Sequence, residues 1–265
     1  MKTDCGVITS VRTVQRALRE CGLRAVRRQK KPKFSPSHQR RRLDFAIRHK
    51  YWTVDDWKRL IWSDETMINR LGSDGSRFVW KNPTSPVVDH HIIPTLKFGG
   101  GSLMMWGCMT YNGVGFACQI VGRMNAEAYV NILDNNFIPT LDSFMLDCSD
   151  IIFQQDNNPK CTSRLAKSWF DENSIEVLEW PAQSPDLNPI EHLWSYLKRK
   201  LLSYETTPES IHELWKRIRD EWYRIPLIVC KKLVEMGQKR VKRSIHGSKN
   251  GVLNGILLSY RTGKT

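Results

Sequence analysis

The segment Ile151-Ile152-Phe153-Gln154-Gln155-Asp156 decides the fold, because an apolar run that ends in a carboxylate is typical of a buried strand at the edge of a site. A helix is predicted next at 162–173, then a β-prone run at 175–180 and a long helix from Asn188. Strands that alternate with helices in this way predict an α/β fold.

The chain before this segment is rich in short β-prone runs separated by Gly and Asn turn signals. Ahead of residue 151 a helix is also predicted at 125–141, because apolar residues recur there at helical spacing. Adjacent strands followed by a β-α-β-α unit predict a mixed sheet flanked by helices. The predicted runs are 60–64, 67–72, 76–82, 102–113 and 116–122.

The charges are divided unevenly along the 265 residues, which carry a formal net charge of +14. Residues 1–63 hold 17 basic and 5 acidic groups, residues 64–191 hold 8 and 16, and residues 192–265 hold 16 and 6. Two basic ends around an acidic middle indicate a polyanion bound at the flanks and carboxylate chemistry at the centre. This pattern excludes an acidic disordered tail and a neutral secreted scaffold.

The seven cysteines form no C-x-x-C pair, so neither a disulfide framework nor a zinc knuckle is indicated. No apolar run approaches the roughly 20 residues that span a bilayer. The N-terminus lacks the apolar core of a signal peptide. We therefore expect a soluble intracellular protein with no membrane partner.

A short helix is predicted between Ser10, a cap candidate, and Gly22, a stop signal. Its polar face carries Arg12 and Arg16, as the recognition helix of a helix-turn-helix motif would. Because few residues precede this helix, we expect residues 1–23 to be the remnant of a helix-turn-helix DNA-binding domain.

Residues 24–58 are predicted to form a basic linker followed by helices. Pro32 and Pro36 disfavour one continuous helix over the basic segment 24–42. Such a segment contacts the DNA backbone, directs nuclear import or does both, and the alternative is a solvated charge run. The residues predicted to contact DNA here are Arg27, Arg28, Lys30, Lys31, Arg40, Arg41 and Arg42.

Three carboxylates stand at the ends of predicted elements. Asp64 closes the run 60–64, Asp156 closes the run 151–156, and Glu191 lies in the first turn of the helix from Asn188. Ligands gather at the carboxyl ends of strands in an open α/β sheet, so the two aspartates converge if their strands are neighbours. Three carboxylates without Cys or His partners suit Mg²⁺ or Mn²⁺. Two such ions, about 3.5 to 4 Å apart, promote in-line attack on a phosphodiester.

Each carboxylate also has a simpler interpretation. Asp64 and Asp156 can be ordinary turn formers at strand ends. Asn188, Pro189 and Glu191 occupy the positions of a capping box, which would explain Glu191 without a metal ion.

Four segments resemble, in order, the signature blocks of the cut-and-paste transposases of the mariner superfamily. The 34 residues between Asp156 and Glu191 resemble the branch of that superfamily whose third carboxylate is Glu. The segments are WSDE at 62–65, GGGSLMMWGC at 99–108, QQDNNPKCTS at 154–163 and WPAQSPDLNPIEHLW at 180–194.

The resemblance implies a ribonuclease H-like catalytic core over 59–203 and a basic helical C-terminal region over 204–265. It implies that Asp64, Asp156 and Glu191 are catalytic and hold two Mg²⁺ or Mn²⁺ ions. The implied reaction is cleavage of double-stranded DNA at transposon inverted repeats and strand transfer into TA target DNA, by a homodimer assembled on DNA in the nucleus. Lys160 and Arg164, near Asp156, are predicted to contact phosphates, and exposed charges at a helix start are the alternative.

Three positions depart from the family pattern, where Phe98, Gln155 and Cys161 stand in place of the usual histidines. None of them is an expected metal ligand, so the changes bear on the positioning of DNA or of the nucleophile. The leading interpretation is a metal-dependent DNA transposase encoded by a degenerate element. The alternatives are a catalytically inactive DNA-binding protein derived from a transposase and a structure-selective nuclease of the same fold.

Overall fold

The computed structural model describes residues 10–21, 34–70 and 101–249, which belong to two compact units divided between residues 33 and 34. The first unit contributes helix α1 (Val11–Glu20). Ser10 begins this helix as predicted, since its Oγ accepts a hydrogen bond from the Thr13 N–H at 3.1 Å. The predicted stop at Gly22 lies outside the described residues.

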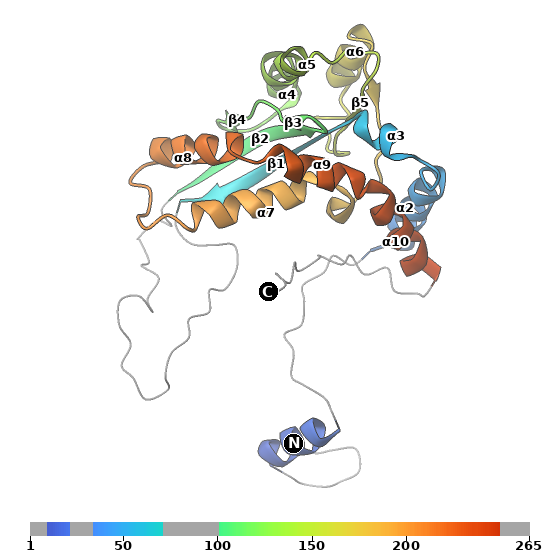
Figure 1. Ribbon diagram of the computed structural model, residues 1–265, viewed down its shortest axis with the longest axis vertical. Coiled ribbons are helices and arrows are strands. Elements are labelled where there is room, and N and C mark those ends of the chain that lie inside the picture. Colours follow the sequence, from blue (N-terminus) through green and yellow to red (C-terminus); the bar gives the residue numbers. More distant parts are fainter. Residues whose placement is uncertain (1–9, 22–33, 71–100, 250–265) are drawn as a thin grey trace. The chain divides into compact units, whose positions relative to one another are not determined.

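The second unit is built on a six-stranded sheet with the order β3-β2-β1-β5-β6, in which β4 also pairs with β2 (Figure 1). β1 runs antiparallel to β2 and parallel to β5, and β5 runs parallel to β6. The predicted mixed sheet is confirmed. The strands are β1 (Leu60–Asn69), β2 (Ser102–Thr110), β3 (Gly113–Val114), β4 (Cys118–Ile120), β5 (Ile152–Gln154) and β6 (Glu176–Val177).

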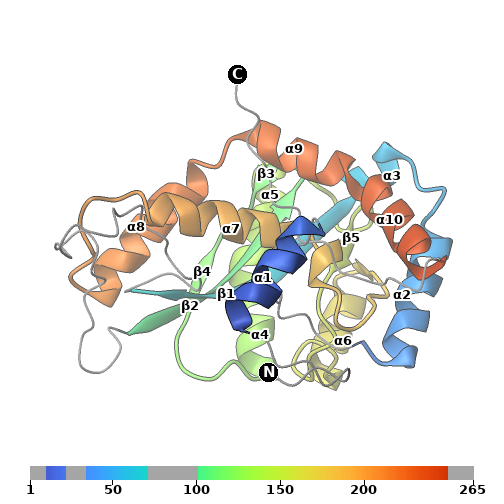
Figure 2. The same ribbon diagram turned by 90° about the horizontal axis from the view of Figure 1, so that it is seen from below.

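Helices cover both faces of the sheet (Figures 1 and 2). One face is covered by α4 (Ala126–Ile132), the π-helical turn η2 (Leu133–Phe137), α5 (Ile138–Phe144) and α6 (Arg164–Glu172). The other face is covered by α7 (Ile190–Leu201), which follows the 3-10 turn η3 (Pro185–Leu187), and by α8 (Ile211–Tyr223) and α9 (Leu227–Glu235). The core on that second face also takes in α2 (Pro36–Arg48), α3 (Val54–Lys58) and α10 (Gly237–Lys249).

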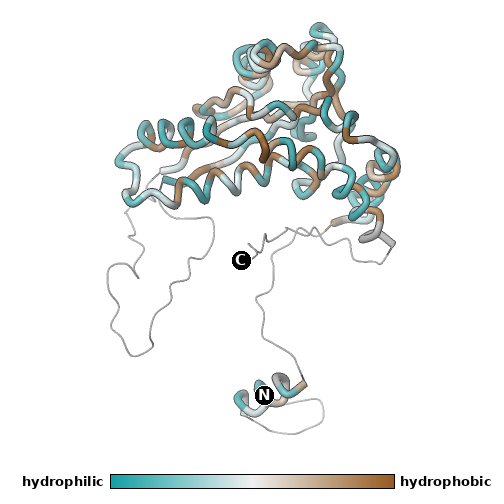
Figure 3. Tube along the Cα trace, viewed as in Figure 1, coloured by the Kyte–Doolittle hydropathy of each residue, from teal (hydrophilic) through white to brown (hydrophobic). Residues whose placement is uncertain are grey.

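Alternation along β1 divides the core into two layers. Leu60 and Trp62 pack with the helices around α7, whereas Ile61 packs with α4 and α6. The hydrophobic stretches of the chain lie along the strands and on the inner sides of the helices (Figure 3). No described helix is both long and apolar enough to cross a membrane.

The structure corrects the strand boundaries around Asp64. The runs 60–64 and 67–72 were predicted as separate strands, but β1 is continuous and pairs with β2 from Trp62 to Asn69. The polar residues between them therefore sit within a strand, and Asp64 lies inside β1 rather than at its end. The predicted strand at 175–180 is reduced to β6, and the predicted run 76–82 lies outside the described residues.

The helices that flank the predicted core 59–203 share its hydrophobic interior. Phe45 and Trp57, which precede the core, are buried in the same cluster as Trp222 and Val241, which follow it. Sequence periodicity shows that these helices have apolar faces, but it does not show what covers them. Residues 34–70 and 101–249 therefore form one packed unit.

Gly107 lies opposite Asp64 on the neighbouring strand β2. A Cβ at this position would stand 2.9 Å from Cη2 of Trp194 and 3.2 Å from Cζ2 of Trp222. The two indoles stack on each other with ring centroids 5.0 Å apart and are buried, so neither ring has room to withdraw. Because Gly107 has no side chain, the indole of Trp194 can pack directly against the sheet at this position.

We expect Gly107→Ala to lower the free energy of unfolding by about 1–3 kcal/mol, because the added methyl group overpacks the two stacked indoles. Urea unfolding followed by tryptophan fluorescence measures the change. Ser102→Ala, at the exposed start of the same strand, is the control and should stay within about 0.5 kcal/mol of the wild type. A Gly107→Ala protein as stable as the control would contradict this account of the packing.

Candidate active site

Asp64 and Asp156 are placed by two neighbouring parallel strands. β1 and β5 pair in parallel with Trp62 opposite Gln154, and each aspartate lies two residues beyond that pair. The condition stated for their convergence, that their strands are neighbours, is confirmed. Glu191 is the second residue of α7, whose residues pack with β1 in one core.

The three carboxylates interact electrostatically. Burial raises the pKa of Asp64 to about 8, with further contributions from the negative charges of Glu191 and Asp156. Burial and the charge of Asp156 raise the pKa of Glu191, and burial raises the pKa of Asp156. The three carboxylates therefore share a partly desolvated region in which Asp156 and Glu191 disfavour the ionisation of Asp64, and Asp156 disfavours that of Glu191.

The donor set suits a hard divalent cation, which prefers carboxylate oxygens and would relieve the repulsion among them. Over the described ranges, no three His, Cys, Asp or Glu side chains already stand at metal-binding positions.

Trp194 holds Asp64 from below the sheet. Its Nε1–H donates a hydrogen bond of 3.0 Å to Oδ2 of Asp64. The indole reaches that oxygen through the space that Gly107 leaves open. α7 therefore supplies both the donor that fixes Asp64 and, one turn earlier, Glu191.

Only half of the predicted capping box is present. Asn188 has an extended backbone and Pro189 a helical one, and Oδ1 of Asn188 accepts a 3.3 Å hydrogen bond from the Ile190 N–H in the first turn. The Asn188 N–H donates to the Pro185 carbonyl at 3.0 Å, so the carboxylate of Glu191 is not its partner.

The comparisons with known proteins agree with this geometry. A family model described as DDE superfamily endonuclease matches residues 59–214, and a helix-turn-helix model described as Transposase matches residues 1–51. The chain is 36% identical over 238 residues to the Tc1 transposase of Caenorhabditis elegans, which covers 90% of this chain and 86% of the relative. It is 34% identical over 245 residues to the Tcb2 transposase of Caenorhabditis briggsae, with 92% and 88% covered. The chain belongs to the Tc1/mariner-type transposases of the DDE superfamily.

The fold of this transposase is also found in solved structures. The Mos1 mariner paired-end complex with Mn superposes with a TM-score of 0.76 at 20% identity, covering 90% of this chain and 71% of that chain. The isolated catalytic domain of Mos1 superposes with a TM-score of 0.63 at 18% identity, covering 83% and 98%. The predicted ribonuclease H-like fold and the enzyme class are confirmed.

Gln155 and Cys161, which replace two of the usual histidines, lie in one buried hydrogen-bond chain of the transposase. The Tyr129 hydroxyl donates to Oε1 of Gln155 at 2.6 Å, and Nε2 of Gln155 donates to the Cys161 carbonyl at 3.0 Å. These bonds tie α4 to the loop on either side of Asp156. The third replacement, Phe98, lies outside the described residues.

Glu65 is a residue of the site region that sequence reasoning missed. Its carboxylate pairs with Nζ of Lys160 at 2.8 Å, and both side chains are largely buried. The positive charge of Lys160 also offsets part of the rise that burial causes in the pKa of Asp156. Lys160, predicted to contact DNA phosphates, is thus engaged by a carboxylate. The signal was present in the sequence, because Glu65 directly follows Asp64 in the WSDE block.

The predicted DNA-binding residues differ in their exposure. Arg12 and Arg16 are exposed on α1, Arg40 and Arg41 on α2, and Arg164 at the start of α6. Arg27, Arg28, Lys30 and Lys31 lie outside the described residues.

Arg42 is the exception, since it is only 2% exposed and faces the interior. Its guanidinium donates to both carboxylate oxygens of Asp186, at 2.8 and 2.7 Å, and lies over the ring of Phe34. We therefore remove Arg42 from the predicted phosphate contacts. Its role is to fasten α2 to the turn η3 that leads into α7.

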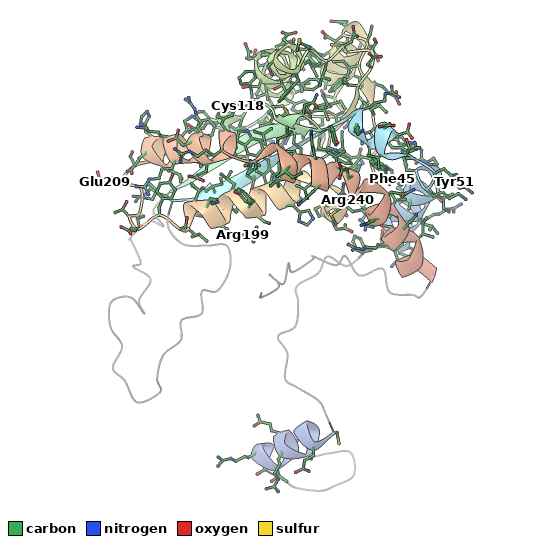
Figure 4. The ribbon with its side chains drawn as sticks, viewed as in Figure 1. Phe45, Tyr51, Cys118, Arg199, Glu209 and Arg240 are labelled. Atoms are coloured by element: carbon green, nitrogen blue, oxygen red, sulfur yellow. The ribbon has the colours of Figure 1, made fainter. Side chains whose placement is uncertain are left out.

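A basic cluster at the end of α7 was not predicted to contact DNA. The last turn carries Lys198, Arg199 and Lys200, and Arg199 is exposed on the side of α7 away from the sheet (Figure 4). The helix dipole favours positive charges at the C-terminal end of a helix, so stabilisation of α7 is an explanation for these residues that needs no DNA.

We expect Asp64→Asn to become increasingly stabilising relative to the wild type as the pH rises from 5 to 8.5 without metal ions. A carboxyl with a raised pKa in the folded state contributes stability at low pH and loses it as the pH rises through about 8. The difference in unfolding free energy should grow by up to about 1.4 kcal/mol per pH unit. Urea unfolding in EDTA measures it, and a difference that stays constant over this pH range would refute the coupling.

We expect Arg42→Met to cost about 3–5 kcal/mol of unfolding free energy, because it leaves the Asp186 carboxylate without its buried partner. Arg41→Met, one residue earlier and exposed, is the matched control and should change stability by less than about 0.5 kcal/mol. Equal stability of the two variants in urea would show that the ion pair does not fasten α2.

Proposed function

We propose that this transposase cleaves phosphodiester bonds of DNA with two divalent cations, Mg²⁺ or Mn²⁺, held by Asp64, Asp156 and Glu191. The observation that carries the proposal is the electrostatic coupling of these three carboxylates, each partly desolvated and two of them on adjacent parallel strands. The solved Mos1 paired-end complexes with Mn and with Mg support this choice of ions.

The chemistry divides between ions and protein. Two bound cations would activate a water molecule or a 3′-hydroxyl and stabilise the leaving oxygen in an in-line displacement. The protein supplies three anionic oxygen donors on a rigid sheet and helix start, and Trp194 Nε1–H fixes one oxygen of Asp64. The core packed on both faces of the sheet keeps these donors from drifting apart.

The proposed substrate is double-stranded DNA at the inverted repeats of the element, with strand transfer into TA target DNA. The solved Mos1 paired-end and strand transfer complexes support the pairing of two ends and the joining step. By the same likeness we propose a homodimer assembled on DNA. We also propose a nuclear location, which the basic N-terminal segment and a DNA substrate favour.

The proposed DNA contacts are the exposed basic residues. Arg12 and Arg16 lie within the 1–51 match to the helix-turn-helix transposase model, which favours a role in binding transposon ends. The phosphate contacts proposed for the second unit are Arg40, Arg41 and Arg164.

We expect Asp156→Asn to lower Mn²⁺-dependent strand cleavage at least about 100-fold, because several kcal/mol of transition-state stabilisation depend on the bound ions. The substrate is a pre-nicked duplex that carries the inverted repeat found beside the coding sequence. Asp171→Asn, an exposed carboxylate on α6, is the matched control and should cleave like the wild type.

Two results would contradict the proposal. Equal cleavage by the wild type and Asp156→Asn would remove the carboxylates from catalysis. DNA binding without cleavage by the wild type, in Mn²⁺ and in Mg²⁺, would favour the inactive DNA-binding alternative.

A further inference from the structure

Three buried polar side chains join the segments that carry the three carboxylates. They are Ser63, Gln154 and Asn188, which are 4%, 0% and 4% exposed. Ser63 directly precedes Asp64, Gln154 stands two residues before Asp156, and Asn188 stands three residues before Glu191. We call these three residues the polar lock.

The hydrogen bonds of the polar lock cross between β1, β5 and the start of α7. Nδ2 of Asn188 donates to the Ser63 carbonyl and to Oε1 of Gln154, both at 3.2 Å. The Ser63 N–H donates to the same Oε1 at 3.3 Å, and the Ser63 hydroxyl donates to the Gln154 carbonyl at 2.8 Å. Each of the three segments is thus bonded to both of the others.

The hydrogen bonds of the polar lock lie beyond the end of the backbone pairing between β1 and β5. The parallel pairing of β1 with β5 ends at Trp62 and Gln154, one residue before Ser63. Beyond that point, the side chains of the polar lock take over from the backbone ladder. They therefore hold β1 and β5 together where the two aspartates emerge, and they hold α7 against both strands where Glu191 emerges.

Burial strengthens the hydrogen bonds of the polar lock. In a low-dielectric interior, hydrogen bonds fix relative positions strongly, and an unmade one is costly. Nε2 of Gln154 has no hydrogen-bond partner among the described residues, so Oε1 alone carries the contacts of that side chain to Ser63 and Asn188. The removal of Asn188 leaves Gln154 and α7 without a direct bond.

We propose that Asn188 is a positioning residue, which sets the spacing of Asp64, Asp156 and Glu191 through the polar lock and so determines how tightly they bind a divalent cation. This inference rests on the proposed function, because it takes these carboxylates as the metal ligands. The competing role for Asn188 is local, since its Oδ1 also accepts from the Ile190 N–H at the start of α7.

Two variants separate the two roles. Asn188→Ala removes every bond of the side chain. Asn188→Ser keeps a short acceptor for the Ile190 N–H, as Ser does in comparable turns, but it cannot span to both Ser63 and Gln154. A third variant, Ser63→Ala, removes the hydroxyl bond between β1 and β5 and leaves Asn188 in place.

The measurement is the dissociation constant for Mn²⁺, by electron paramagnetic resonance of free Mn²⁺ and by isothermal titration calorimetry, on the full chain without DNA. Urea unfolding in EDTA reports the stability of each variant. Ile218→Val, a buried change on α8, which carries none of the three carboxylates, is the control for destabilisation alone. Asp156→Asn is the control for loss of the site.

We expect Asn188→Ala and Asn188→Ser each to weaken Mn²⁺ binding by about 10- to 100-fold, as is usual when the partners of metal ligands are removed. Ser63→Ala should weaken it less, and Ile218→Val should leave it unchanged. Wild-type affinity in Asn188→Ser would overturn the proposal in favour of the local role. Wild-type affinity in Asn188→Ala would overturn it outright.

The failure of the proposed function gives a different result. In that case Asp156→Asn binds Mn²⁺ as the wild type does, or the wild type binds none, and both proposals fall together. If Asp156→Asn loses the ion while both Asn188 variants keep it, only the role of the polar lock is refuted.

Discussion

Carboxylates repel one another, and burial adds to the free energy that each negative charge costs. In this transposase the rest of the structure has to work against both effects: burial raises the pKa of Asp64, Asp156 and Glu191, and neighbouring carboxylates raise the pKa of Asp64 and Glu191 further. The carboxylates are kept together by elements that are stable for other reasons. β1 and β5 pair through their backbones, and α7 is fixed by its buried apolar face.

The packing beneath the sheet connects distant parts of the chain to this site. Trp222 of α8 stacks on Trp194 of α7, and Trp194 bonds Asp64 through the space beside Gly107. Before the start of α7, Arg42 of α2 forms a salt bridge with Asp186 of η3. α2 and α8, which precede and follow the three carboxylates in sequence, thus set the position of α7. Through α7 they set the positions of Glu191 and of Trp194, which donates to Asp64.

Buried polar contacts hold the loop after β5. Gln155 accepts from Tyr129 and donates to the backbone carbonyl of Cys161. Lys160 and Glu65 pair with each other. The chain on either side of Asp156 is therefore tied to α4 and to β1.

The sequence by itself determined the α/β class, the mixed sheet and the family, and it nominated the three carboxylates as the candidate metal ligands. Local apolar patterns and long motifs carry that information, and they need no knowledge of what lies across the fold. Only the tertiary structure decided that β1 runs unbroken past Asp64, that Arg42 is buried against Asp186 and that the side chain of Asn188 bonds Ser63 and Gln154 as well as the first turn of α7. These features join residues up to 144 positions apart, and a pattern along the chain cannot specify which distant group satisfies a buried polar atom.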